Sequence, residues 1–161
     1  MTPDPTLTPF NALVGNWTTE ATHPGMQGVV VHGTVVVEWL EGARFLNVHA
    51  RTDHPDFPDA LSVIGDMDHD REGAGGKPLV ATPSSLRLYY FDSRGVFRLC
   101  ETSIDATSWR VSRMAPGFSQ RFTGRFSDGG DTIRGTWELC TDDIHWADDL
   151  AIAYRRERRP R

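Results

Sequence analysis

The sequence predicts an all-β protein in which antiparallel strands form an up-and-down, closed β-barrel of about 8–10 strands. Three observations predict this class. Runs rich in β-branched and aromatic residues alternate with short polar stretches, turn residues separate them at close intervals, and no segment has a convincing amphipathic helical pattern. Closure is expected because it leaves no strand edge unpaired, and a barrel of this size can hold one small ligand.

The elements are predicted as follows. Residues 1–12 form a proline-containing leader with a short helical turn that plugs one end of the barrel. Strands are expected at 15–22, 28–40, 44–52, 60–67, 85–91, 96–104, 108–114, 118–126, 132–140 and 146–155. Residues 68–78 are expected to form a mobile loop and residues 157–161 a basic tail. A chain of 161 residues fits a single domain, 1–161.

Composition and charge exclude several classes of function. The net charge of -5 and the absence of a recognition motif argue against a nucleic-acid partner, although five arginines lie in residues 155–161. No apolar stretch has the length of a membrane span or the pattern of an export signal, so we expect a cytoplasmic protein without a membrane partner. Cys100 and Cys140 are expected to be reduced and buried, with a bridge between neighbouring strands as the alternative. No spacing of ligands predicts a metal site.

Short motifs at both ends of the chain resemble the calycin superfamily, which includes the lipocalins, the fatty-acid-binding proteins and the nitrobindins. They are Gly15-x-Trp17 on the first strand, the turn at 38–42 and the ending at 149–156. The resemblance implies that Trp17 closes one barrel end against a basic side chain of the last strand, Arg155 or Arg156. It also implies a likeness to uncharacterised bacterial nitrobindin-like barrels. In nitrobindins a histidine before the leucine of the last strand binds haem. Asp149 stands at that position here, so we expect no haem and no other cofactor.

Polar residues interleaved with aromatic ones in the middle strands suggest a ligand site. Alternate positions of the middle strands give Tyr90, Arg98, Arg113, Gln120, Phe122 and Trp137 as candidate ligand-binding residues. Trp39, one of the large aromatic residues, and Asp149 of the last strand are added to these candidates. The alternative is that the opposite faces, with Phe97 and Leu99 among them, form the interior. The pattern favours the polar-lined cavity only slightly, because both faces of these strands carry large apolar residues.

The expected function is the binding of a small, largely apolar molecule, with an anionic or carbonyl group met by Arg98 or Arg113. A binding protein is favoured over an enzyme, but the second stays open. The alternative enzyme is of the cyclase or isomerase type, in which Tyr90 or Asp149 moves a proton. A third alternative, haem or nitric-oxide handling, follows from the resemblance alone. If the polar face looks inward, Phe97 and its outward neighbours leave apolar patches that would suit a homodimer.

Overall fold

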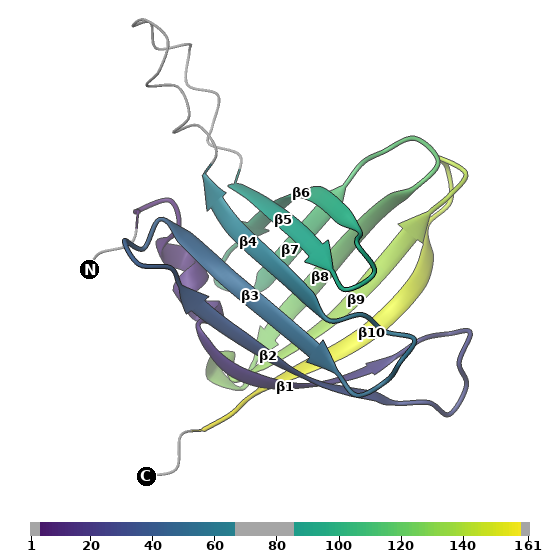
Figure 1. Cartoon of the computed structure of the whole chain (residues 1–161), viewed down its shortest axis with the longest axis horizontal. Helices are drawn as coiled ribbons and strands as arrows, with labels where there is room; N and C mark the ends of the chain where they lie inside the picture. The colour runs from purple at the N-terminus through teal and green to yellow at the C-terminus, as the bar shows by residue number, and fades with distance from the viewer. Residues whose placement is uncertain (1–3, 67–85, 159–161) are drawn as a thin grey trace, which may run out of the picture.

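Ten antiparallel strands form one closed barrel in the computed structural model, which describes residues 4–66 and 86–158 (Figure 1). Each strand pairs with its neighbours in sequence, and β1 pairs with β10 to close the ring. The strands are β1 (Gly15–Thr22), β2 (Val31–Trp39), β3 (Phe45–Thr52), β4 (Ala60–Asp66), β5 (Leu86–Asp92), β6 (Phe97–Ile104), β7 (Ser108–Arg113), β8 (Ser119–Ser127), β9 (Thr132–Cys140) and β10 (Ala147–Arg156). The predicted all-β barrel is confirmed.

The strand positions agree with the expected ranges except at a few ends. The largest difference is at β2, which begins at Val31 and not at Gly28. Gly28 has a φ of 75°, a left-handed conformation that interrupts an extended strand, and the N–H of Val29 donates to the carbonyl of Met26 in a turn. The expected loop at 68–78 and the end of the basic tail, 159–161, lie outside the described residues.

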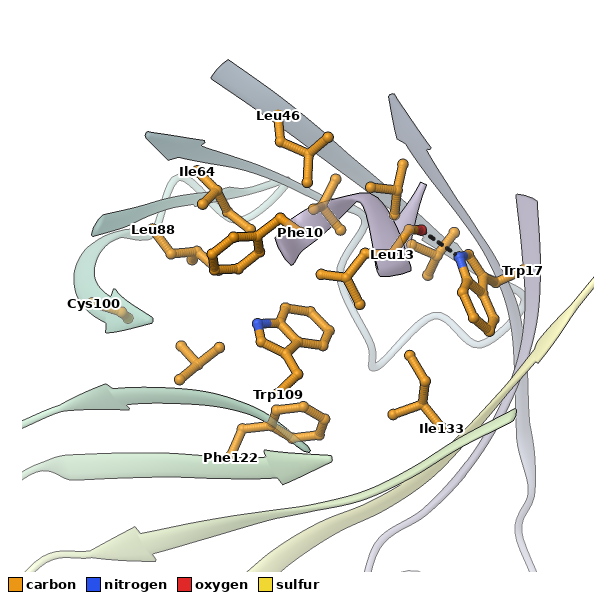
Figure 2. Packing of buried hydrophobic residues seen from close by; sticks show 14 of the residues in the cluster. Phe10, Leu13, Trp17, Leu46, Ile64, Leu88, Cys100, Trp109, Phe122 and Ile133 are labelled. Carbon is orange, nitrogen blue, oxygen red and sulfur yellow. Dashed lines mark hydrogen bonds between the residues drawn. The ribbon is translucent and has the colours of Figure 1, made fainter. Parts of the chain in front are cut away.

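One barrel end is closed by the 3-10 helix η1 (Thr8–Leu13), which enters the barrel mouth as the leader was predicted to do. Phe10 and Leu13 are fully buried, and Figure 2 shows Phe10 pointing toward Ile64 and Leu88 of the barrel wall. The indole Nε1 of Trp17 donates to the carbonyl of Leu13 over 2.8 Å, which ties the helix to the first strand (Figure 2). We call this the plugged end and the opposite one the far end.

The plugged end is also held by the last strand, through Arg156. Its guanidinium lies 4.1 Å from the centre of the Trp17 ring and donates to the carbonyls of Val14 and Ala12, at 2.5 and 2.7 Å. A third bond reaches Asp131 Oδ1 at 3.1 Å. The resemblance implied either Arg155 or Arg156 in this role, and the structure selects Arg156; Arg155 is exposed.

Large side chains fill the barrel behind the plug. The inward residues Leu46, Ile64, Leu88, Trp109, Phe122 and Ile133 are all buried in one cluster with Phe10, Leu13 and Trp17 (Figure 2). Phe122 packs over two facing glycines, Gly124 and Gly135, which pair across β8 and β9. A Cβ atom at Gly135 would lie 2.2 Å from Cε2 of Phe122, so glycine at this position makes room for the ring.

The two cysteines are both buried and free, as expected. Cys100 faces the interior from β6 and belongs to the core cluster, while Cys140 ends β9 beside Asp142. In the described part of the chain, no helix has the length and apolar character needed to cross a membrane.

Candidate functional site: a polar wall inside the barrel

Four polar side chains on neighbouring strands line the interior near the far end. Tyr90 of β5 is paired with Arg98 of β6, and Arg113 of β7 is paired with Gln120 of β8. We call these four residues the polar wall. Alternation along β6 places Arg98 and the buried Cys100 on the inner face, whereas Phe97 lies outside with 56% of its surface exposed. The polar-lined arrangement is therefore the one that the structure adopts.

Several interior side chains near the far end stay partly accessible: Ala50, Tyr90, Arg98, Gln120, Trp137, Leu150 and Ile152. Ala21 and Val31 at the same end are buried, and Trp39, Ile104, Phe126 and Tyr154 at the plugged end are also only partly buried. Water therefore reaches the side chains beside the polar wall, and we call the space next to them the hollow.

Arg98 and Arg113 carry positive charge into this hollow without a carboxylate partner. The Arg98 guanidinium lies 4.8 Å from the centre of the Phe118 ring, and Arg113 Nη1 donates to the carbonyl of Phe118 over 2.9 Å. Among the described residues, no acidic group comes within ion-pairing distance of either arginine. Burial raises the pKa of the Cys100 thiol, while the charges of Arg113 and Arg98 act in the opposite direction. The polar wall is thus electropositive between β6 and β7.

The fourth member of the polar wall, Tyr90, is held in a closed hydrogen-bond group. Its hydroxyl donates to Asp92 Oδ2 over 2.9 Å, and Arg94 Nη2 donates to the same oxygen over 2.7 Å. Burial, followed by the hydrogen bond and the charge of Asp92, raises the pKa of Tyr90 to about 12. Burial alone would raise the pKa of Asp92, but the hydrogen bonds from Arg94, Tyr90 and the backbone lower it to about 2. Neither group is poised to exchange a proton near neutral pH.

The structure places two of the predicted site residues elsewhere. Trp39 faces inward, but at the plugged end, where its Nε1 donates to Asn11 Oδ1 over 2.9 Å. Asp149 lies at a register shift of β10, with one carboxylate oxygen 3.3 Å from His23 Nε2. Because β10 pairs only with β9 and β1, Asp149 and Tyr90 of β5 are not brought together by strand pairing.

Tyr154 is an interior residue that the sequence analysis missed. It follows Leu150 and Ile152 on the inner face of β10, and its ring centre lies 6.4 Å from those of both Trp17 and Trp109. Burial raises its pKa to about 12. The available signal was the alternation of Leu150, Ile152, Tyr154 and Arg156, four residues that share one face once the register shift between Asp148 and Leu150 is allowed for.

Phe122 and Trp137 were predicted correctly to face the interior. The rings of Trp109 and Trp137 lie 5.3 and 5.2 Å from that of Phe122, between the polar wall and the plugged end. We call these three residues the aromatic cluster. A separate, shallow hollow of about 160 Å³ lies over β1, β2 and β10, with Glu20, His32 and Arg155 among its lining residues. Its volume is below that of usual small-molecule sites.

The comparisons with known proteins concern the fold. Neither a family model nor a curated protein matches the chain. The solved structure of Rv2717c from M. tuberculosis matches with a TM-score of 0.65 and 16% identity, over 98% of this chain and 100% of that one. The S-type phycobiliprotein lyase CPES from Guillardia theta matches with a TM-score of 0.56 and 9% identity, over 98% and 100%. Both matches extend over almost the whole chain and agree with the closed antiparallel barrel. Identities this low show the fold alone.

The inner face does not fit a haem that is bound through an imidazole. Asp149 occupies the position that the resemblance compared with a haem-binding histidine, and its carboxylate faces His23 in the β1–β2 connection. The described histidines that belong to strands, His32 and His49, are exposed on the outer face. No group of three His, Cys, Asp or Glu residues in the described ranges is placed to hold a metal ion.

Proposed function

We propose that the barrel binds one small, largely apolar molecule that carries an anionic group. The apolar part would occupy the hollow against the aromatic cluster, and the anionic group would bind Arg98 and Arg113. The observation that carries the proposal is the pair of inward arginines that have no carboxylate partner within residues 4–66 and 86–158. A charge that is taken out of water without a partner is costly, and an anionic ligand would supply that partner.

The composition of the hollow supports the same proposal. Small-molecule sites combine apolar and aromatic walls with a few polar groups that fix orientation. Here the aromatic cluster provides the apolar wall, and Arg98, Arg113 and Gln120 provide the polar groups. Guanidinium groups bind carboxylates and sulfonates through charge-assisted hydrogen bonds, which are stronger than neutral ones. An enzymatic function has less support, because the Tyr90 hydroxyl is bound to Asp92 and the Asp149 carboxylate lies beside His23.

A pair of fluorescent probes tests the proposal. 8-Anilino-1-naphthalenesulfonate and N-phenyl-1-naphthylamine share one skeleton and differ in the sulfonate. We expect both probes to bind. In the double variant Arg98→Met/Arg113→Met, the affinity for the sulfonate probe should fall by roughly 10–100-fold, while the affinity for the neutral probe should change little. Arg110→Met, on the exposed outer face of β7, is the matched control and should change neither affinity.

Two outcomes would contradict the proposal. One is an equal loss of affinity for both probes in the double variant, because this would show that the arginines stabilise the fold and do not bind the anionic group. The other is sulfonate binding that survives in the double variant. The outside of the barrel also carries exposed apolar side chains, Phe97 among them, which could bind the probe. The titration is therefore repeated in Phe97→Ser, which leaves the interior side chains unchanged. Loss of the sulfonate probe there would place it outside the barrel.

A further inference from the structure

The Tyr154 hydroxyl has no hydrogen-bond partner among the described residues. The side chain comes from β10 and lies against Trp109 of the aromatic cluster and Trp17 of the plugged end. Every fully enclosed side-chain nitrogen or oxygen in the described structure has a hydrogen-bond partner. The Tyr154 hydroxyl has none, so it is not fully enclosed and water can reach it. A phenol inside a barrel usually finds a hydrogen-bond partner. For the inference below we take the space beside the Tyr154 hydroxyl to be continuous with the hollow at the polar wall.

The groups that line the hollow are mainly unused donors. Trp137 carries an indole N–H and Arg98 a guanidinium, and both lack a hydrogen-bond acceptor among the described residues. The inward carboxylate near the polar wall, Asp92, already accepts from Tyr90 and Arg94. The Gln120 amide can both donate and accept, so the charged and aromatic donors outnumber the free acceptors, and the interior matches a ligand that is rich in hydrogen-bond acceptors.

The donors lie at two depths. Arg113 is four residues from Trp109 along β7, which corresponds to about 13 Å along the strand. Tyr154 lies beside Trp109, so its hydroxyl is at the inner end of the hollow and Arg113 is near the outer end. Aromatic side chains fill the wall between them.

We infer that the ligand is polar at both ends: an anionic group binds Arg98 and Arg113, an aromatic or otherwise apolar body packs against the aromatic cluster, and a hydrogen-bond acceptor at the inner end receives the Tyr154 hydroxyl. This inference rests on the proposed function and adds the inner acceptor to it. A planar acid with a carbonyl or ether oxygen at its far end has the required chemistry. A plain fatty acid lacks the second polar group.

Two naphthoates that differ in a single substituent test the inference. 6-Acetyl-2-naphthoate has a carbonyl acceptor opposite its carboxylate, and 6-isopropenyl-2-naphthoate has the same planar shape with a CH2 group in place of the oxygen. We expect the protein to bind the acetyl compound about 5–10-fold more tightly, as one neutral hydrogen bond in a water-poor site would give. Tyr154→Phe keeps the ring and should remove this preference. Tyr89→Phe is the matched control and should keep it, because Tyr89 lies on the outer face of β5, between Val63 and Leu99.

The outcomes distinguish this inference from the proposed function. Equal affinities for the two naphthoates in the unmodified protein would overturn the inner acceptor and leave anion binding in place. A preference that persists in Tyr154→Phe would overturn the role of Tyr154. If neither naphthoate binds while the sulfonate probe does, the two-ended geometry is wrong. If no probe of either test binds, the proposed function fails and this inference fails with it.

A second inference comes from the outside of the barrel. The outer face of β3 to β6 is apolar over two rows of paired residues: Leu61, Phe91 and Phe97 form one, and Val63, Tyr89 and Leu99 form the next. Phe45 packs on Gly65 beside them. Five of these side chains are between 38% and 56% exposed, and the rings of Phe91 and Phe97 are 5.3 Å apart. We call these seven side chains the outer apolar face.

The size of the outer apolar face fits one side of a dimer interface. At roughly 200 Å² for a fully exposed side chain of this size, its five most exposed members present about 400 Å². The largest patch on a typical monomer is about 300–600 Å² and is often functional. A standard interface buries about 800 Å² on each partner, of which a little over half is apolar. The face therefore supplies most of the apolar area that one protomer needs.

We propose that the outer apolar face packs against the same face of a second copy. A two-fold dimer brings identical patches together, and two sheet faces can stack at about 10 Å. The edge of the face carries both signs of charge, since Arg87 and Glu101 are cross-strand neighbours. An edge of mixed sign does not repel its own copy, whereas the net charge of -5 opposes an anionic lipid surface.

Sedimentation equilibrium over micromolar to submillimolar concentrations tests this proposal. We expect a dimer, and we expect Phe91→Ser/Phe97→Ser to weaken dimerisation by at least about 100-fold, because four large apolar side chains leave the interface. Met114→Ser replaces a more exposed apolar residue outside the face and should leave the dimer intact. A monomer at every concentration would overturn the proposal, as would a dimer that the double variant does not weaken.

Discussion

Replacement of Arg156 by methionine should destabilise the barrel more than any other single surface-accessible change at the plugged end. The guanidinium donates to the carbonyls of Val14 and Ala12, to Asp131 and, at 3.3 Å, to the carbonyl of Gly130. It also covers the Trp17 ring. Hydrogen bonds from charged groups contribute about 1.5–3 kcal/mol each when removed singly, and the cation–π contact about 1 kcal/mol. These terms are not additive, and the side chain is 24% exposed.

We therefore expect a loss of about 3 kcal/mol in the free energy of unfolding, measured by urea titration followed by tryptophan fluorescence. For a domain of this length the melting temperature should fall by about 6–12 °C. Arg155→Met is the matched control: its side chain is exposed on the same strand, so the change should stay below about 0.5 kcal/mol. The loss of stability in Arg156→Lys should lie between those of Arg156→Met and Arg155→Met, because an ammonium group cannot stack on Trp17 and reach the same acceptors at once. A loss below about 1 kcal/mol in Arg156→Met would refute this account of the closure.

Two further predictions concern the interior and the pH dependence. Gly135→Ala should lower stability by about 1–3 kcal/mol in the same urea titration, because the new Cβ would overlap the Phe122 ring, and Gly135→Ala with Phe122→Leu should recover part of that loss. Asp92 has a pKa of about 2 in the folded chain, below its usual value, so its contribution to stability is complete above pH about 4 and is lost as the pH falls toward 2. Asp92→Asn should therefore have a lower free energy of unfolding at pH 7 than the unmodified protein, and it should lose less of that free energy between pH 4 and pH 2. If the stability of the variant falls with acid as steeply as that of the unmodified protein, this account of Asp92 is wrong.

The fold could be predicted because strand length, turn residues and the Gly15-x-Trp17 motif all point to the same barrel. The orientation of the middle strands could be predicted only weakly. In β6, Phe97 and Leu99 are as apolar as an interior requires, while Arg98 alternates with Cys100 on the other face. The structure turns the first pair outward. Hydrophobicity alone favours the opposite choice, because the apolar side chains of the outer face mimic a core.

The candidate site was predicted in part, for reasons that are local. Arg98 and Arg113 were placed correctly because simple alternation holds along β6 and β7. Asp149 was chosen from the resemblance and from its place beside Asp148, and the structure places it at a register shift against His23. Tyr154 was missed although Leu150, Ile152 and Tyr154 alternate after that shift. A β-bulge has no reliable sequence signature, and a residue beyond one cannot be assigned to a face by counting. The role of Trp39 depends on the position of η1, which local patterns do not specify.

The pairing of β1 with β10 has a consequence for how the protein is made. Thr18 and Arg155 are neighbours across this seam although 137 residues separate them, and the plugged end needs both Trp17 and Arg156. During synthesis the earlier strands emerge from the ribosome before the tenth, so the ring stays open with unpaired edges until the last strand emerges. Chaperone dependence and aggregation during expression should therefore be governed by the final ten residues of the sheet, Ala147–Arg156.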